Sequence, residues 1–312
     1  AMHTEWRDYK INIIDTPGID DFIGEVISAV RVCDTAVVLL NAQHGVEASS
    51  EVIWDYVDRY QKPTIFVINQ LDHEYSNFSK TAEEARNIFG TAVTVMQYPV
   101  NQGAGFNAII DLLKMTMYRF PSNGGKPEKL AIPDDEKERA AFLHNQLVEK
   151  AAENDEKLME MYFEKGNLDE DELRDGIKKG MMKHQIFPLF CMSAKKDMGS
   201  GRLMGFIDNV APSAVEMPPE KTFEGKDVPC KPDGAPVLFV YKTLVEPHLG
   251  KLNFFKVLSG EVNAGIEVSN MRTNASEKLQ QLFIMDGKNR TPVDKLKAGD
   301  IACTLKLKNT LS

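Results

Sequence analysis

Residues 64–72 read Thr-Ile-Phe-Val-Ile-Asn-Gln-Leu-Asp, an unbroken apolar run that ends in a polar cluster. A continuous run of β-branched and aromatic residues is typical of a strand covered on both faces, as the strands of parallel sheets are. The stretch therefore predicts a buried central strand over residues 64–68. The carboxyl end of this strand carries Asn69, Gln70 and Asp72.

Two more strand-like runs end in polar clusters. Residues 11–14 are followed by Asp15-Thr16-Pro17-Gly18, and residues 186–192 are followed by Ser193-Ala194-Lys195. Open α/β sheets bind ligands outside the carboxyl ends of their strands, so the three clusters together predict one ligand that crosses this edge. Taken singly, each cluster is also typical of an ordinary strand-end cap or a Pro-Gly turn. Their shared placement favours the ligand site.

Strands and helices alternate along most of the first two thirds of the chain. This alternation predicts crossover connections, a mostly parallel sheet and therefore an α/β fold. The predicted strands are residues 10–14, 35–40, 64–68, 92–97 and 186–192, and the predicted helices are residues 21–32, 46–60, 81–89 and 200–210.

The region from about residue 100 to residue 185 interrupts this alternation. Periodicity leaves residues 106–120 open as helix or strand. Residues 133–165 carry the stripe of one long amphipathic helix, and the acidic run from Asp169 to Glu172 predicts the start of a second helix, where acids suit the macrodipole. We expect a solvated surface insertion.

After a proline-rich linker the pattern changes to short strands separated by turns, without crossover helices. The predicted strands are residues 236–243, 253–259, 266–270 and 301–307. This pattern predicts a second domain, a small antiparallel β-barrel.

The polar clusters have a chemistry that fits a guanine nucleotide. A carboxylate only accepts hydrogen bonds, so Asp72 can take both the ring N–H and the amino group of guanine, a pair that adenine does not offer. Asn69 would hold neighbouring loops, and the loop 193–195 would give a backbone N–H to the base carbonyl. Asp15 could hold Mg²⁺ through water, and the N–H of Gly18 could meet a terminal phosphate oxygen.

Composition narrows the class of protein. The 312 residues carry a net charge of −9, but residues 221–312 carry 14 Lys and Arg against 10 Asp and Glu, which permits one RNA-facing module on an acidic body. No apolar run approaches the roughly 20 residues of a membrane span. Four scattered cysteines predict reduced thiols. We therefore expect a cytoplasmic monomer, with neither a membrane nor DNA as a partner.

With these motifs, the chain resembles the elongation factor G family of translational GTPases. The segments that carry the resemblance are residues 13–18, 66–72 and 250–260. The resemblance implies a P-loop-GTPase-like domain over residues 5–215 with an insertion at about 100–185, and a translation-factor β-barrel over residues 216–312. It also implies GTP or GDP with Mg²⁺ as ligands, bound through Asp15-Thr16-Pro17-Gly18, Asn69, Gln70, Asp72 and Ser193-Ala194-Lys195. Through the parent protein, the partner is the ribosome, in elongation and translocation.

The chain departs from the family pattern in ways that affect nucleotide chemistry. The phosphate loop G-x-x-x-x-G-K-[ST] is absent, so we expect a fragment of a longer protein that binds GTP poorly by itself. Gln70 stands where the family has Lys. Ile19 stands where the family has the His that positions the attacking water, so no catalytic residue is assigned.

These departures leave two alternatives beside a translocating GTPase. One is a paralogue that binds GTP and the ribosome with little hydrolysis, which Ile19 favours. The other is a ribosome-protection or regulatory factor of the same architecture.

Overall fold

The computed structural model describes residues 1–18, 20–246 and 250–312, which form two compact units. One unit is Thr35–Pro212, and the other combines Ala1–Asp34 with Ser213–Ser312. Residues 5–34 are thus grouped with the C-terminal strands. Within the part of the chain that is described, no helix combines the length and apolar composition that crossing a bilayer requires.

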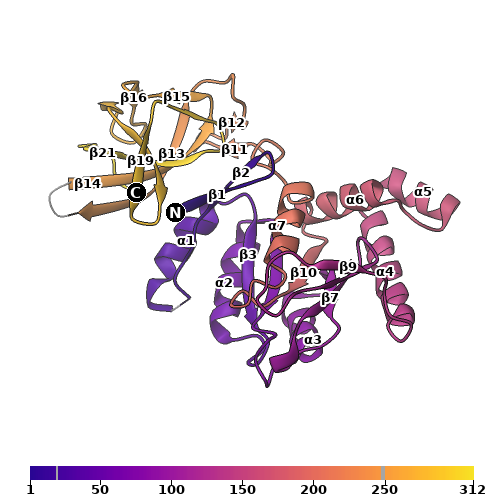
Figure 1. Ribbon diagram of the computed structural model, residues 1–312. Helices are drawn as coiled ribbons and strands as arrows, with labels where there is room; N and C mark the ends of the chain where they lie inside the picture. Colours follow the sequence, from indigo (N-terminus) through magenta and orange to yellow (C-terminus); the bar gives the residue numbers. More distant parts are fainter. Residues whose placement is uncertain (19, 247–249) are drawn as a thin grey trace. The chain divides into compact units, whose positions relative to one another are not determined.

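A four-stranded parallel sheet forms the centre of the unit Thr35–Pro212 (Figure 1). Its strand order is β3-β4-β10-β5, with β3 at Ala36–Asn41, β4 at Thr64–Asn69, β10 at Phe187–Cys191 and β5 at Val93–Val95. All three neighbouring pairs run parallel. The predicted α/β class with a parallel sheet is confirmed.

Helices cover both faces of this sheet. Trp54 on α2 (Ala48–Arg59) and Phe89 on α3 (Phe78–Phe89) contact Phe66 on β4, with ring centroids 5.4 Å and 4.6 Å from Phe66. Phe190 on β10 points the opposite way, because its register partner is Val67, and it meets Phe206 on α7 (Ser200–Asn209) at 4.8 Å. Two covered faces explain why β4 reads as one apolar run.

The region predicted as an insertion begins with strands, so residues 106–120 are not helical. β6 (Gln97–Pro99), β7 (Ala108–Asp111), β8 (Thr116–Arg119) and β9 (Glu128–Leu130) form an antiparallel sheet, and the short 3-10 turn η2 (Gly103–Gly105) lies between β6 and β7. The helices that follow are α4 (Lys137–Ala152), α5 (Glu156–Lys165) and α6 (Glu170–Met182).

The single helix predicted over residues 133–165 is wrong. The chain breaks between α4 and α5, where Asp155 accepts a hydrogen bond from the N–H of Leu158 at 3.1 Å and caps α5. The region predicted as an insertion is also less solvated than expected, since Leu147 on α4 and Ile177 on α6 are fully buried in the core of the unit.

The second unit is antiparallel, as predicted. Its five-stranded sheet has the order β13-β14-β21-β18-β19, and smaller two-stranded ladders accompany it, an arrangement compatible with the predicted barrel. The strands are β11 (Glu220–Lys221), β12 (Asp227–Val228), β13 (Val237–Glu246), β14 (Gly250–Ser259), β15 (Glu261–Asn263), β16 (Glu267–Ser269), β17 (Ser276–Lys278), β18 (Leu282–Asp286), β19 (Asn289–Val293), β20 (Lys295–Lys297) and β21 (Ile301–Leu305).

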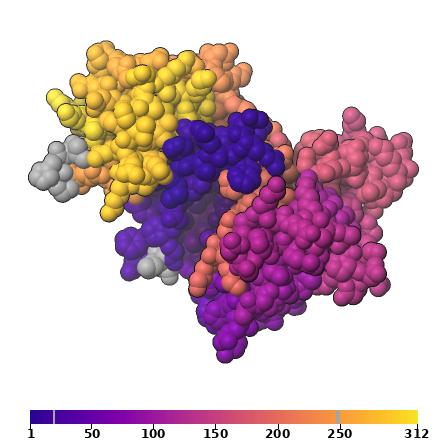
Figure 2. Space-filling view, viewed as in Figure 1, coloured from indigo at the N-terminus to yellow at the C-terminus, as the bar shows by residue number. Residues whose placement is uncertain are grey.

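The first residues of the chain belong to this antiparallel unit. β1 (Met2–Trp6) and β2 (Tyr9–Ile13) form a hairpin, followed by η1 (Asp20–Phe22) and α1 (Ile23–Val32). Figure 2 shows the indigo N-terminal residues lying against the yellow C-terminal strands, and the N–H of Gly287 donates to the Ala1 carbonyl at 3.1 Å. The prediction that residues 10–14 form a strand of the parallel sheet is therefore wrong, because this segment pairs within its own hairpin.

Candidate functional site at the ends of the parallel strands

The carboxyl ends of β4 and β10 lie side by side. Ile68 is the register partner of Cys191, so the loops after both strands leave the sheet at the same edge. We call the residues that these loops present the strand-end cluster: Asn69, Gln70, Asp72, Ser193, Ala194 and Lys195.

Two hydrogen bonds that involve side chains join the loops of the strand-end cluster. The Ser193 hydroxyl donates to Asp72 Oδ1 at 2.7 Å, and the N–H of Ala194 donates to Asn69 Oδ1 at 3.0 Å. The structure thus brings together two of the three polar clusters singled out in the sequence, although more than 120 residues separate them along the chain.

A tight turn holds the loop after β10 in place. Ser193 and Met198 exchange two backbone hydrogen bonds of 2.9 and 3.0 Å, and Ser193 is fully buried. Gly199 follows at φ +102°, a backbone conformation that favours glycine, and a Cβ there would lie 2.7 Å from the Cβ of Met192. The turn leaves Ala194 and Lys195 exposed while the Ser193 hydroxyl stays inside.

The geometry of Asp72 suits a purine edge that presents two donors. The carboxylate is partly exposed, and Ser193 occupies one of its lone pairs on Oδ1. Oδ2 and the remaining lone pair are acceptors that the guanine ring N–H and amino group match. Asn69 uses its side-chain oxygen within the protein, which suits a role in holding the loops rather than in reading a base.

Gln70 is exposed and has a left-handed backbone, with φ +66°. Its side-chain oxygen accepts a hydrogen bond of 3.1 Å from Asn41 Nδ2 at the end of β3. Asn41 belongs to none of the three polar clusters that the sequence indicates. The signal was nevertheless present, since Asn41 ends its strand as Asn69 ends the next, and the two are register partners.

The segment Asp15-Thr16-Pro17-Gly18 belongs to the other compact unit, so the structure does not join it to the strand-end cluster. Asp15, Pro17 and Gly18 are exposed, and a Cβ on Gly18 would meet no atom within 4 Å. Ile19, which the resemblance predicts to stand at the position of the family's catalytic His, lies outside the described residues.

The oxygen donors of this segment fit Mg²⁺ held mainly by water and phosphate. Mg²⁺ prefers oxygen ligands and usually binds proteins through one or two carboxylates while keeping several waters. Asp15 and Thr16 supply a carboxylate and a hydroxyl. Among the described residues, no group of three or more His, Cys, Asp or Glu side chains could hold a metal by itself.

Cys191, the last residue of β10, has a structural role. It is fully buried, and burial raises the pKa of its thiol well above the ordinary value, so the thiol stays neutral. Its carbonyl accepts a hydrogen bond of 2.8 Å from the side chain of Gln97, which is also buried. A neutral buried thiol is a poor nucleophile, so Cys191 is no candidate for catalysis.

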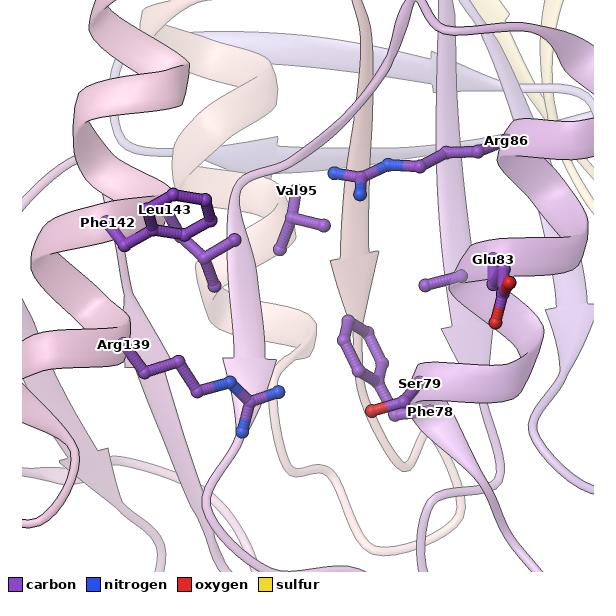
Figure 3. Close-up of a pocket in the computed structure, with 9 residues that line it drawn as sticks. Phe78, Ser79, Glu83, Arg86, Val95, Arg139, Phe142 and Leu143 are labelled. Carbon is purple, nitrogen blue, oxygen red and sulfur yellow. The ribbon is translucent and has the colours of Figure 1, made fainter.

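A separate groove lies between α3 and α4 and has a volume of about 530 Å³ (Figure 3). Phe78, Val95 and Leu143 line it together with the charged side chains of Arg86 and Arg139. The lining includes no member of the strand-end cluster. Arg139 is also stacked on Tyr98, with its guanidinium carbon 4.2 Å from the ring centre.

Comparison with known families assigns the chain to a class. The family described as "Elongation factor Tu GTP binding domain" matches residues 1–213, and the one described as "Elongation factor G domain 2" matches residues 236–312. The chain therefore belongs to the family of translational GTPases with an elongation factor Tu-type GTP-binding domain, and within that family it is elongation factor G-like.

Individual relatives agree with this assignment. Proteins named elongation factor G from Petrotoga mobilis, Mycoplasma pneumoniae and Mycoplasma genitalium are 35%, 34% and 31% identical over 317 residues. The matches cover 99% of this chain but only 46% of each relative, so the chain spans about half their length. A crystal structure of a Thermus thermophilus protein shares the fold, with a TM-score of 0.86 at 23% identity over 99% of this chain and 44% of that one.

Proposed function

We propose that this chain recognises the base of a guanine nucleotide through its strand-end cluster. The observation that carries the proposal is the pair of hydrogen bonds that join Ser193 to Asp72 and Ala194 to Asn69. They hold an acceptor-only carboxylate beside exposed backbone at the edge where parallel sheets bind ligands. Lys195 and Gln70, both exposed, would flank the nucleoside.

The other end of the nucleotide would be served by Asp15-Thr16-Pro17-Gly18. Asp15 would hold Mg²⁺ through water, and the N–H of Gly18 would meet the terminal phosphate of GTP. We also propose that residues 5–215, with their insertion, act as the GTP-binding domain and that residues 216–312 act as the second domain.

At the level of the whole protein, we propose a GTPase that acts on the ribosome during translation elongation. The family assignment supports this role, and so do the relatives named elongation factor G. The excess of basic residues over 221–312 suits a surface that meets RNA on an otherwise acidic chain. Translocation is the step that we propose.

Replacing the carboxylate of residue 72 by an amide, which donates as well as accepts hydrogen bonds, tests whether Asp72 recognises the base. In the full-length protein that carries this sequence, Asp72→Asn should weaken GTP binding at least about tenfold and favour XTP, because xanthine presents a carbonyl where guanine presents its amino group. Asp171→Asn on the exposed side of α6 is the matched control and should leave the GTP preference unchanged. Retention of GTP preference by Asp72→Asn would exclude Asp72 as the base-reading residue.

Ile19 supports a second candidate, a factor that binds GTP and the ribosome but hydrolyses GTP slowly. An aliphatic side chain can neither orient water nor move a proton, functions that contribute about 10²–10⁴ in rate. Single-turnover hydrolysis on ribosomes should be slow for the natural protein and faster for Ile19→His. If the natural protein hydrolyses GTP rapidly, or Ile19→His brings no increase, this candidate fails.

A further inference from the structure

Two residues with carboxamide side chains, Asn41 and Gln70, lie at the carboxyl ends of the neighbouring strands β3 and β4. Asn41 ends β3, and Gln70 directly follows β4. The side-chain oxygen of Asn41 accepts hydrogen bonds from the backbone N–H groups of Gln43, at 2.8 Å, and His44, at 3.3 Å. Backbone N–H groups only donate, so these two bonds require the oxygen of the Asn41 amide on that side and its NH₂ group on the other.

The orientation of Asn41 determines the orientation of Gln70. Asn41 Nδ2 donates to Gln70 Oε1 at 3.1 Å, so Gln70 must present its oxygen to Asn41. Gln70 Nε2 then keeps its hydrogens for an outside acceptor, and the residue is exposed. The backbone N–H of Gly45 donates to the Asn41 carbonyl at 2.8 Å, which holds the turn after Asn41. We call the hydrogen bonds from this turn through the Asn41 amide to the Gln70 amide the relay.

We infer that Asn41 is a positioning residue that fixes the polarity of the Gln70 amide, so that the strand-end cluster offers a neutral N–H donor to the bound nucleotide. The sugar and phosphate oxygens of a nucleotide accept hydrogen bonds, and this donor is complementary to them. The inference rests on the proposed function, because the ligand is the guanine nucleotide assigned to the same site.

Asn41→Asp reverses the direction of the hydrogen bond between residue 41 and Gln70, while the side chain of residue 41 keeps almost the same shape. The new carboxylate still accepts from the N–H groups of Gln43 and His44, so the turn is retained, but it has no hydrogen to give to Gln70. The Gln70 amide must turn its NH₂ group toward position 41. Its oxygen then faces the acceptor oxygens of the nucleotide, where it is repulsive.

Side-chain amide NMR of the 312-residue chain tests the orientation without any nucleotide. In the natural sequence, the Gln70 NH₂ protons should exchange with water as an exposed amide does. In Asn41→Asp they should shift and become protected, because they now bond to the carboxylate. Protection already present in the natural sequence, or no change in the variant, would overturn the inference.

A double-mutant cycle tests the functional consequence in the full-length protein. Asn41→Asp should weaken GDP binding about tenfold when Gln70 is present, and much less in the Gln70→Ala background, where only the added negative charge acts. Equal losses in both backgrounds would refute the relay. If Asp72→Asn also leaves base preference unchanged, the proposed function fails; if Asp72→Asn changes it, only the role of Asn41 fails.

Discussion

Ser193 is completely buried, yet its hydroxyl makes the side-chain contact that holds Asp72. Ser193→Ala should lower the free energy of unfolding by about 1–2 kcal/mol, because Asp72 and the N–H of Lys196 both lose their bond to this oxygen. The full-length variant should also bind GDP more weakly. Ser79→Ala, at an exposed position on α3, is the control and should change stability by less than about 0.5 kcal/mol in denaturant titrations. Equal effects of the two substitutions would count against a role for the Ser193 hydroxyl.

Gly199 allows a second prediction at the scale of one residue. Gly199→Ala places a methyl group 2.7 Å from the Cβ of Met192 and puts a residue with a side chain at φ +102°. The free energy of unfolding should therefore fall by about 2–4 kcal/mol. Gly166→Ala has a related backbone, φ +71°, with no neighbour within 4 Å, and should cost only about 1–2 kcal/mol. Chemical denaturation measures the free energy of unfolding of both variants. A loss for Gly199→Ala no greater than that for Gly166→Ala would contradict the close packing of this turn.

At the scale of the element, the start of α6 predicts a pH dependence. Asp169 and Glu172 form a capping box, and the backbone N–H of Asp169, followed by the Lys165 ammonium, lowers the pKa of Glu172. A carboxyl whose pKa is lowered by folding stabilises the fold above its unfolded pKa of about 4.3, and this contribution is lost as the pH falls below that value.

Glu172→Gln tests this dependence. The stability advantage of the natural sequence over Glu172→Gln should be constant near neutral pH and should shrink as the pH falls through about 4.3 toward 3. Urea titrations over this range measure it. Glu160→Gln on the exposed side of α5 serves as the control. A difference between the natural sequence and Glu172→Gln that does not change with pH would argue against the ionised capping box.

At the scale of the whole molecule, each compact unit has its own core. One core includes Phe66, Ile110 and Leu147, and another includes Phe255 and Leu296. The two tryptophans report on the units separately, since Trp6 lies in the antiparallel unit and Trp54 in the α/β unit. Fluorescence in Trp6→Phe and Trp54→Phe backgrounds can therefore follow each unit in turn.

Lys256→Met should affect only the unit that contains Trp6. The Lys256 ammonium donates to the Val32 carbonyl at 2.8 Å and to Asp34 at 2.5 Å from a side chain that is only 8% exposed. Lys256→Met leaves both acceptors without this donor, and it should lower the free energy of unfolding of this unit by about 2–3 kcal/mol. Lys10→Met breaks the more exposed pair with Asp300 and should cost less than about 1 kcal/mol. A shift of the Trp54 transition by Lys256→Met would show that the units unfold together.

Local sequence patterns predicted that the polar loops after β4 and β10 meet, but they missed the boundary between α4 and α5 and the pairing partner of β2. Asn69, Asp72 and Ser193 were recognisable because each follows a strand-like run. The break before α5 was missed because the apolar stripe continues through it to Leu158, while the Asp155 cap interrupts the backbone. Asn41 was missed because its importance depends on the neighbouring strand.

The amino-acid sequence by itself determined the α/β class, the strand after which each polar cluster falls and the membership of the family, since these depend on periodicity and residue type along the chain. Only the tertiary structure decided that residues 9–13 pair as a hairpin, that Ser193 bonds to Asp72 and that Asn41 orients Gln70. The reason is physical: strand pairing and hydrogen bonds between distant residues depend on which segments meet in space, and many pairings satisfy the same local pattern.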